Sequence, residues 1–331
     1  MRIAAAACVW RDRRAISSNQ GDYMRSTVRP LRYRDLRFPG LSMPVLPRNL
    51  AALALVSLAL AAAPSHPQPP SQVQPLRVMS FNIRLPVESD GPNQWQHRKA
   101  LIADMVRAQD ADLIGTQELH KVQADDLVKR LPQYTWFGRD RRGGHDDEHM
   151  GVFYRSDRLR MIESGDFWLS DTPEVPGSIT WGHPLPRMVT WALFERLSDR
   201  RRFHLLNTHF PYRDEDEDAR ERGARLIASR VSKLPADIPV IVMGDFNTTP
   251  DSRAHAALTA DLRDVWDTAP QRSGPAATFH EFTGKPDQRI DWILYRDLQP
   301  LSVRTVTEHE GGRYPSDHFP VVAEFVFPGS R

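Results

Sequence analysis

Eight short apolar segments between residues 78 and 327 limit the possible folds of this chain, because each has the length of a β-strand. The predicted strands cover residues 78–84, 112–118, 151–155, 188–195, 203–209, 239–244, 289–295 and 321–327. Apolar residues at helical spacing predict helices at 98–109, from 119 to about 131, at 216–233 and at 252–258. This order predicts an α/β (α+β) fold with two packed sheets and outer helices, because the strand-rich middle is unlike a βαβ repeat.

The first predicted strand shows the clearest alternation of apolar and polar side chains. In the sequence VMSFNIR (residues 78–84), Met79, Phe81 and Ile83 fall on one side, and the polar residues fall on the other. Side chains of a strand point alternately to its two faces. The pattern therefore predicts a strand that is buried on one face only.

An apolar run at residues 50–63 precedes this body and is followed by a Pro-rich stretch at 64–75. The run is shorter than the roughly 20 residues that span a bilayer. A short apolar run that ends in small residues is typical of a secretory signal peptide. We therefore expect a signal peptide at 43–63, cleavage near Ala61–Ala63, and a mature chain without a transmembrane anchor. An uncleaved anchor is the alternative.

Met43 lies directly before the apolar run, where a signal peptide would begin. We therefore interpret residues 1–42 as a misassigned extension, 64–75 as a linker and 76–328 as the working domain. The export signal predicts a periplasmic or secreted protein. The only cysteine of the chain is Cys8, so the domain offers neither a disulfide nor a thiolate for chemistry.

The net charge of the whole chain is +2, and it is positive only because of the N-terminal extension. Residues 1–42 contain nine Arg, three Asp and no Lys or Glu, a net of +6, which leaves −4 for the remainder. Binding to nucleic acid rests on a basic surface. We therefore expect no stable complex with nucleic acid, and we expect a monomer.

Polar residues stand at the ends of several predicted strands, where folding alone would not require them. They are Asn82, Glu118, His209, Asp245, Asn247, Asp291, Asp317 and His318. Strand ends converge at one edge of a sheet core, and buried carboxylates gathered there would repel each other without a cation. Carboxylate and amide oxygens favour Mg²⁺ or Mn²⁺, with Ca²⁺ possible. The chain has neither a GxxxxGK[ST] phosphate loop nor a GxSxG elbow, which weighs against NTPases and serine hydrolases.

Six short motifs, in this order, resemble those of the endonuclease/exonuclease/phosphatase superfamily, which has the DNase I-like fold. They are Phe81-Asn82, Gln117-Glu118, Asn207-Thr208-His209, Gly244-Asp245-Phe246-Asn247, Arg289-Ile290-Asp291 and Ser316-Asp317-His318. The resemblance covers residues 76 to 327. It implies a four-layer sandwich of two mixed β-sheets packed face to face with flanking helices.

The resemblance also implies the roles of the site residues in hydrolysis of a phosphoester. Glu118 resembles the principal metal-binding carboxylate, with Asn82 and Asp317 nearby. Asp245 matches the residue that orients or deprotonates the attacking water, and Asn247 matches its partner.

The remaining residues match positions around the phosphate. His318 corresponds to a His that contacts the scissile phosphate, Asp291 to the carboxylate that orients it, and His209 to another phosphate contact. An Asp–His pair favours the charged imidazole, which suits an anionic transition state. Whether one or two metal ions act is left open.

Three positions add detail to this resemblance. Arg84 stands where some family nucleases carry an acid, so a second metal ligand from that strand is absent. Arg187 lies between a proline and a strand, and an Arg binds phosphate with two donors. Glu148 matches an acid that a bacterial branch of the family carries. We expect Arg187 and Glu148 to contact the substrate, and either core packing or the substrate cleft accounts for Trp168 and Trp181.

The predicted function is therefore a divalent-metal-dependent phosphodiesterase or phosphatase, in which water attacks a phosphoester in line. Its substrate is a small molecule, a nucleic acid or a lipid head group. A secreted nuclease, a sphingomyelinase-type lipid phosphodiesterase and a non-catalytic binding module on the same fold remain as alternatives. The fold alone does not select among them.

Overall fold

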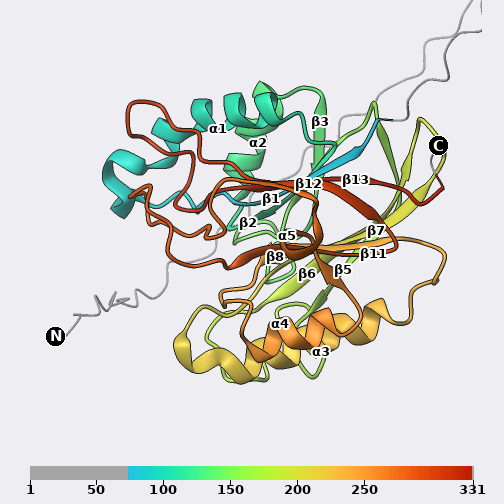
Figure 1. The fold of residues 1–331 in the computed structure, drawn as a ribbon. Coiled ribbons are helices and arrows are strands. Elements are labelled where there is room, and N and C mark those ends of the chain that lie inside the picture. The colour runs from blue at the N-terminus through green and yellow to red at the C-terminus, as the bar shows by residue number, and fades with distance from the viewer. Residues whose placement is uncertain (1–73, 330–331) are drawn as a thin grey trace, which may run out of the picture. The chain divides into compact units, whose positions relative to one another are not determined.

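The computed structural model describes residues 74–329, which form two β-sheets packed against each other (Figure 1). The first sheet has the strand order β10-β12-β13-β1-β2-β4-β3 and the second has β5-β6-β7-β8-β11-β9. The strands of the first sheet are β1 (Leu76–Asn82), β2 (Leu113–Gln117), β3 (Tyr134–Phe137), β4 (Val152–Arg155), β10 (Gln271–Ser273), β12 (Gln299–Thr305) and β13 (Val321–Val326). Those of the second are β5 (Leu159–Trp168), β6 (Met188–Arg196), β7 (Arg202–His209), β8 (Val240–Asp245), β9 (Arg263–Asp264) and β11 (Asp291–Arg296).

Helices cover the outer face of each sheet. In Figure 1, α1 (Trp95–Gln109) and α2 (Lys121–Arg130) lie above the first sheet, and α3 (Glu217–Val231) and α4 (Arg253–Thr259) lie below the second. The short helices are α5 (Val265–Thr268) and the 3₁₀ turns η1 (Glu88–Asn93) and η2 (Asp214–Asp216). The predicted four-layer sandwich is therefore confirmed.

Both sheets are mixed, as predicted. β1 pairs with β2 and β7 pairs with β8 in parallel, whereas β13 pairs with β1 and β11 pairs with β8 antiparallel. The inner faces meet in one apolar cluster that includes Val78, Leu205 and Met243. Two further clusters bind α1 and α2 to the first sheet and α3 and α4 to the second. Apolar burial on both faces of each sheet holds the strand ends in fixed positions.

Gly115 in β2 lies at a position where side chains of the second sheet approach the first sheet closely. A Cβ atom at this position would lie 2.7 Å from Asn207 Oδ1 and 2.7 Å from Met243 Sδ, both in the second sheet. Only glycine fits here, because a side chain would displace buried atoms of the facing strands. The glycine thus lets the sheets approach each other beside the strand ends that carry the polar residues.

The prediction that the strand at 78–84 is buried on one face only was wrong. Phe81 and Ile83 pack toward α1 and α2, but Ser80 and Asn82 on the opposite side are also fully buried. The second sheet covers the face that the alternation assigned to solvent. Asn82, on this inner face, is polar because it belongs to the candidate site.

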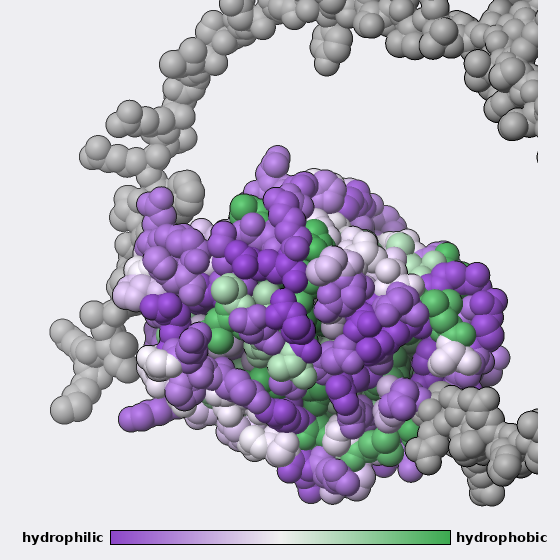
Figure 2. Space-filling model, turned by 90° about the horizontal axis from the view of Figure 1, so that it is seen from above, coloured by the Kyte–Doolittle hydropathy of each residue, from purple (hydrophilic) through white to green (hydrophobic). Residues whose placement is uncertain are grey.

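The predicted signal peptide at 43–63, the extension at 1–42 and most of the linker at 64–75 lie outside the described residues. Within the described part, no helix combines the length and apolar character needed to cross a membrane. Seen from the side of α1 and α2, the surface is mainly hydrophilic, and its hydrophobic residues form small separate patches (Figure 2). That face offers no large apolar patch.

Candidate active site

Three predicted site residues form a row across neighbouring strands of the second sheet. His209 at the end of β7 pairs in register with Asp245 at the end of β8, which in turn pairs with Asp291 at the start of β11. All three side chains are buried. Because register fixes neighbouring strands residue by residue, the sheet places these groups side by side without help from loops.

The first sheet contributes Asn82 and Glu118. The Asn82 side chain donates from Nδ2 to Glu118 Oε1 at 3.1 Å and to Asp245 Oδ2 at 3.0 Å. Ser316 Oγ donates to the backbone oxygen of Asn82 at 2.7 Å, which anchors the loop that carries the next two site residues. The amide of Asn82 therefore joins the polar ends of both sheets.

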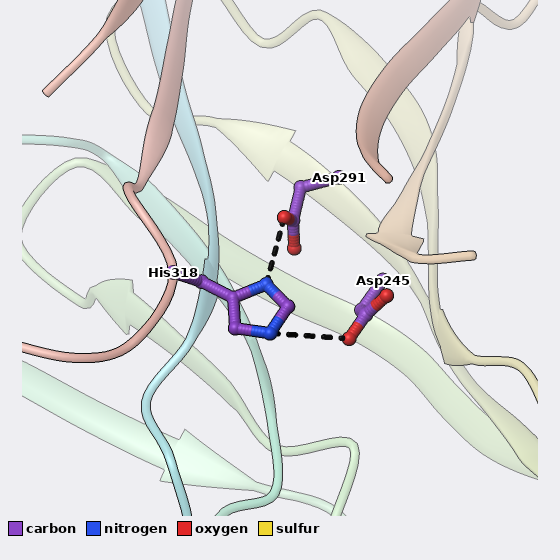
Figure 3. A group of neighbouring side chains, drawn as sticks. All are labelled: Asp245, Asp291 and His318. Carbon is purple, nitrogen blue, oxygen red and sulfur yellow. Dashed lines mark hydrogen bonds and ion pairs between the residues drawn. The ribbon is translucent and has the colours of Figure 1, made fainter. Parts of the chain in front are cut away.

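His318 pairs with two carboxylates of the second sheet (Figure 3). Its Nδ1 lies 2.9 Å from Asp291 Oδ2, and its Nε2 lies 3.8 Å from Asp245 Oδ2. Burial alone would lower the pKa of His318, but the charges of Asp291 and Asp245 outweigh it and raise the pKa to about 10. The imidazole is therefore held in its protonated form at neutral pH.

Asp245 is the buried carboxylate on which the site converges. Burial and the charge of Asp291 raise the pKa of Asp245 well above its ordinary value. Asp245 Oδ1 accepts a hydrogen bond from the backbone of Asn247 at 2.9 Å, and Asn247 Nδ2 donates to the backbone oxygen of Phe210 at 3.0 Å. Asn247 thus positions Asp245 through its backbone, while its own side chain ties the loop to the end of β7.

Three residues at the site adopt the left-handed backbone region. The φ angles are 59° for Arg84, 60° for Glu118 and 48° for Asn247. Such angles are uncommon for residues other than glycine and cost free energy that the surrounding structure must offset. Each angle turns the chain one or two residues after the end of a strand, near the polar side chains of the site.

Glu118, Asn82 and Asp317 provide oxygen atoms suited to a hard cation. Glu118 Oε2 accepts from the backbone of Leu85 at 3.0 Å, which fixes the carboxylate. Burial and the charge of Glu118 raise the pKa of Asp317, although the nearby His318 and Arg84 oppose this. Two facing carboxylates of this kind fit a divalent cation, because a positive ion would remove their repulsion.

Another group could also hold a metal by geometry. Asp245, Asp291 and His318 each offer an atom within 4.8 Å of the others. However, the Nδ1 of His318 already pairs with Asp291. We therefore interpret this group as an imidazole paired with carboxylates, and not as a set of free metal ligands.

Arg187 and Glu148 lie on the other side of His209. Glu148 Oε2 is 3.9 Å from His209 Nδ1, and Asp245 Oδ2 is 3.5 Å from His209 Nε2. Burial, followed by the charges of Arg187, His318 and Arg141, holds the pKa of His209 well below its ordinary value. His209 is therefore a neutral imidazole, with Glu148 near one ring nitrogen and Asp245 near the other. The positive charges of Arg187 and Arg141 lie nearby.

Arg141 was missed by the sequence analysis. It lies in the β3–β4 loop, where Nη1 is 2.8 Å from Glu148 Oε1. The same loop contains Arg139 and Arg142, and no signal in the sequence distinguishes the one arginine that is buried. Trp168 belongs to the core, since it is 1% exposed and packs with Met150 and Met188.

The structure thus brings all ten predicted site residues into one region, at corresponding ends of the two sheets. Comparison with known proteins gives this arrangement a context. A model of the endonuclease/exonuclease/phosphatase family matches residues 79–318. The chain belongs to the endonuclease/exonuclease/phosphatase family.

Two solved structures of this family are similar over nearly their whole length. A family protein from Bacteroides thetaiotaomicron is 33% identical, covers 77% of this chain and 99% of its own, and superposes with a TM-score of 0.73. A mannosyl-6-phosphatase from the same species is 32% identical over 76% of this chain and 100% of its own, with a TM-score of 0.72. Human Nocturnin is 25% identical over 78% of this chain and 67% of its own length.

Proposed function

We propose that this chain is a divalent-metal-dependent phosphoester hydrolase. One observation carries the proposal: Asn82 links Glu118, on the cation side, to Asp245, which also lies beside His318. Groups for a cation, for a base and for a positively charged phosphate contact are therefore joined by hydrogen bonds and an ion pair. Members of the family are phosphoester hydrolases, and the similarity to a mannosyl-6-phosphatase agrees with this chemistry.

Asn82, Glu118 and Asp317 would hold the cation, which we propose to be Mg²⁺ or Mn²⁺, with Ca²⁺ as a weaker candidate. When bound, the ion would polarise a phosphoryl oxygen and offset negative charge in the transition state. The imidazolium of His318 would add a second positive contact to the phosphate. Asp291 keeps that imidazole oriented through Nδ1, so that Nε2 remains available to donate.

Asp245 would act on the attacking water. Its carboxylate accepts hydrogen bonds from Asn82 and from the backbone of Asn247, which orient it before the substrate arrives. A base whose pKa is raised toward neutrality accepts a proton more readily than an ordinary carboxylate does. We therefore assign to Asp245 Oδ2 the proton that leaves the water as it attacks phosphorus.

A panel of phosphoesters tests the proposed function. Purified protein would be given p-nitrophenyl phosphate, bis(p-nitrophenyl) phosphate, plasmid DNA, RNA and sphingomyelin, with Mg²⁺ or Mn²⁺ and with chelator. We expect turnover of at least one phosphoester that requires metal. Failure to turn over any of the five with metal would contradict the proposal and favour a non-catalytic binding module on this fold.

Phosphatase activity on a small molecule is the form of the reaction that the observations favour. The mannosyl-6-phosphatase is 32% identical. The chain beyond residue 42 carries a net negative charge of −4, which disfavours binding to extended polyanions. A secreted nuclease or a sphingomyelinase-type enzyme would be shown by the same panel.

We also propose that the domain is exported as a monomer after cleavage of a signal peptide. The apolar run at 50–63 and the Pro-rich stretch after it support this. The intact mass of the natural protein would give the cleavage site, and light scattering would give the oligomeric state. A protein that retains residues 50–63 would contradict cleavage.

A further inference from the structure

Two buried arginines flank Glu148 at the edge of the proposed active site. Arg187 stands directly before β6 and Arg141 lies in the β3–β4 loop, and their exposed fractions are 2% and 7%. Arg141 is held by carboxylates, with Nη1 2.8 Å from Glu148 Oε1 and Nη2 2.9 Å from Asp147 Oδ1. The Nε and Nη1 atoms of both arginines have no hydrogen-bond partner within residues 74–329. Arg187 differs in that, unlike Arg141, it has no ion pair with a carboxylate among these residues.

A buried guanidinium without a partner is costly, because it has lost its hydration and gained no compensating ion pair. The same region contains a second unpartnered group, since His209 Nδ1 also lacks a hydrogen bond among the described residues. Burial, followed by the nearby charges of Arg187, His318 and Arg141, lowers the pKa of this His. Arg187 and Arg141 therefore place two positive charges beside the neutral His209, and a bound anion would complete this positive region.

The β3–β4 loop, which carries Arg141, is fixed by contacts with neighbouring segments. Trp168 Nε1 donates to the backbone oxygen of Arg141 at 2.6 Å, which fixes the β3–β4 loop against the end of β5. Gly143 of the same loop lies against Pro176 of the β5–β6 loop, so closely that a Cβ atom there would be 2.7 Å from that proline. These contacts hold the loop that carries Arg141 in place.

The charge of the ligand distinguishes the two kinds of phosphoester. A phosphomonoester carries about −1.5 to −2 at pH 7, whereas a diester carries a single negative charge on its phosphate. Glu148 contributes one negative charge between two guanidinium groups, so an anion is still needed beside Arg187. Arginine binds the free oxygens of a phosphate with two parallel donors, and a monoester has one more such oxygen than a diester.

We propose that Arg141 and Arg187 form a pocket for a terminal phosphate and make this enzyme prefer phosphomonoesters over phosphodiesters. The inference rests on the proposed function and names its substrate class. Arg187 binds the non-bridging oxygens directly, and Arg141 holds Glu148 and adds the second positive charge. Glu148 keeps the pocket from carrying two uncompensated charges before the substrate binds.

The test compares two substrates that share a leaving group. p-Nitrophenyl phosphate is a monoester, and methyl p-nitrophenyl phosphate is the matching diester. The variants are Arg141→Met and Arg187→Met, with Arg141→Lys as the conservative change. Arg142→Met is the matched control, because Arg142 is a neighbouring arginine that also pairs with Asp147 but is largely exposed.

We expect Arg141→Met and Arg187→Met to lower kcat/KM for the monoester about 10- to 100-fold more than for the diester, as loss of a charged hydrogen bond implies. Arg141→Lys should recover part of the loss, and Arg142→Met should leave both substrates unchanged. Equal losses for both substrates would overturn the inference while leaving the proposed function intact. Absence of metal-dependent turnover of the monoester by the wild type would also overturn the inference, and turnover of any of the other phosphoesters of the panel would then leave the proposed function intact.

A binding measurement without metal makes the test independent of catalysis. Inorganic phosphate is added to the chelated protein and the melting temperature is recorded against chloride at equal ionic strength. We expect phosphate to raise the Tm of the wild type and of Arg142→Met, because a ligand that binds only the folded state stabilises it. It should not raise the Tm of Arg187→Met, and an equal rise in that variant would contradict the pocket even if the variant folds less stably.

Discussion

Asn82 Nδ2 donates a hydrogen bond to Asp245 Oδ2 across 3.0 Å, although Asn82 ends β1 in the first sheet and Asp245 ends β8 in the second. The bond is buried, so neither partner is satisfied by water. It makes the spacing of the two sheets part of the candidate active site. A change that alters how the sheets pack is therefore expected to affect the proposed catalytic groups.

Asp245→Asn should lower kcat by at least about 10²-fold, because it removes the proposed base. The substitution keeps the size of the side chain and an oxygen that can accept from Asn82, so the fold should persist. Activity on p-nitrophenyl phosphate with Mg²⁺ and a thermal melt would be measured together. Asp251→Asn, at an exposed position six residues further on, serves as the control. Near wild-type turnover in Asp245→Asn would remove Asp245 from the mechanism.

His318→Gln should also lower kcat by about 10²-fold or more, since it removes a charged phosphate contact. The chain provides a matched control in His255, another buried His that pairs with a carboxylate, at 3.0 Å from Asp264. His255→Gln breaks a similar bond outside the site. We expect it to lower the melting temperature while leaving kcat unchanged. Equal loss of kcat in both variants would indicate that His318 acts only through stability.

His318 should remain protonated well above neutral pH in the chelated protein. Its pKa is raised from 6.5 to about 10, chiefly by Asp291 and Asp245 against the effect of burial. The pKa of His318 is higher in the folded chain than in the unfolded chain. Protonated His318 therefore makes its full contribution to the stability of the fold below about pH 6.5. That contribution is lost as the pH rises toward about 10.

Nitrogen NMR of the imidazoles would measure this titration directly. His280 gives an opposite reference in the same spectrum, because burial lowers its pKa to about 4 and it should be neutral at pH 7. Asp291→Asn should move the titration of His318 to lower pH. A wild-type His318 that is neutral at pH 8 would show that the two carboxylates do not hold its proton.

Glu118→Gln should weaken divalent-cation binding at least about 10-fold, because it removes one carboxylate charge while keeping the shape of the side chain. Binding of Mn²⁺ would be followed by calorimetry and by electron paramagnetic resonance, which do not depend on turnover. Glu163→Gln, at an exposed position on β5, should bind Mn²⁺ as the wild type does. Unchanged Mn²⁺ affinity in Glu118→Gln would place the cation elsewhere, with Asp245, Asp291 and His318 as the next candidates.

The convergence of the site could be predicted because its residues stand at strand ends, and the paired registers of β7, β8 and β11 then place His209, Asp245 and Asp291 in a row. Elements with weaker patterns were missed. β5 carries a run of exposed and half-exposed residues from Arg160 to Asp166, which hides its alternation. β12 begins with Gln299 and Pro300 and is likewise only partly buried.

Other features depend on tertiary packing and leave no local trace. The burial of both faces of β1 follows from the second sheet, which no pattern within residues 78–84 can report. The choice of Arg141 as the buried arginine follows from where the β3–β4 loop meets Trp168. Arg139 pairs with Asp166 at the surface, yet it looks the same in the sequence.

Gly115→Ala tests whether the spacing of the sheets supports the site. The added methyl group would lie 2.7 Å from Asn207 Oδ1 and from Met243 Sδ, so these side chains of the facing sheet must shift. Overpacking of this kind costs roughly 1–3 kcal/mol, and a domain of this size loses about 2–4 °C of melting temperature for each kcal/mol. Asn207 Oδ1 accepts from Gln117, the neighbour of Glu118, so the displacement should also weaken Mn²⁺ binding. Gly144→Ala is the control, because its methyl group would meet Asp140 Oδ2 at an ordinary 3.5 Å. A Gly115→Ala variant with wild-type stability and wild-type Mn²⁺ affinity would show that the sheets tolerate a wider spacing than this site implies.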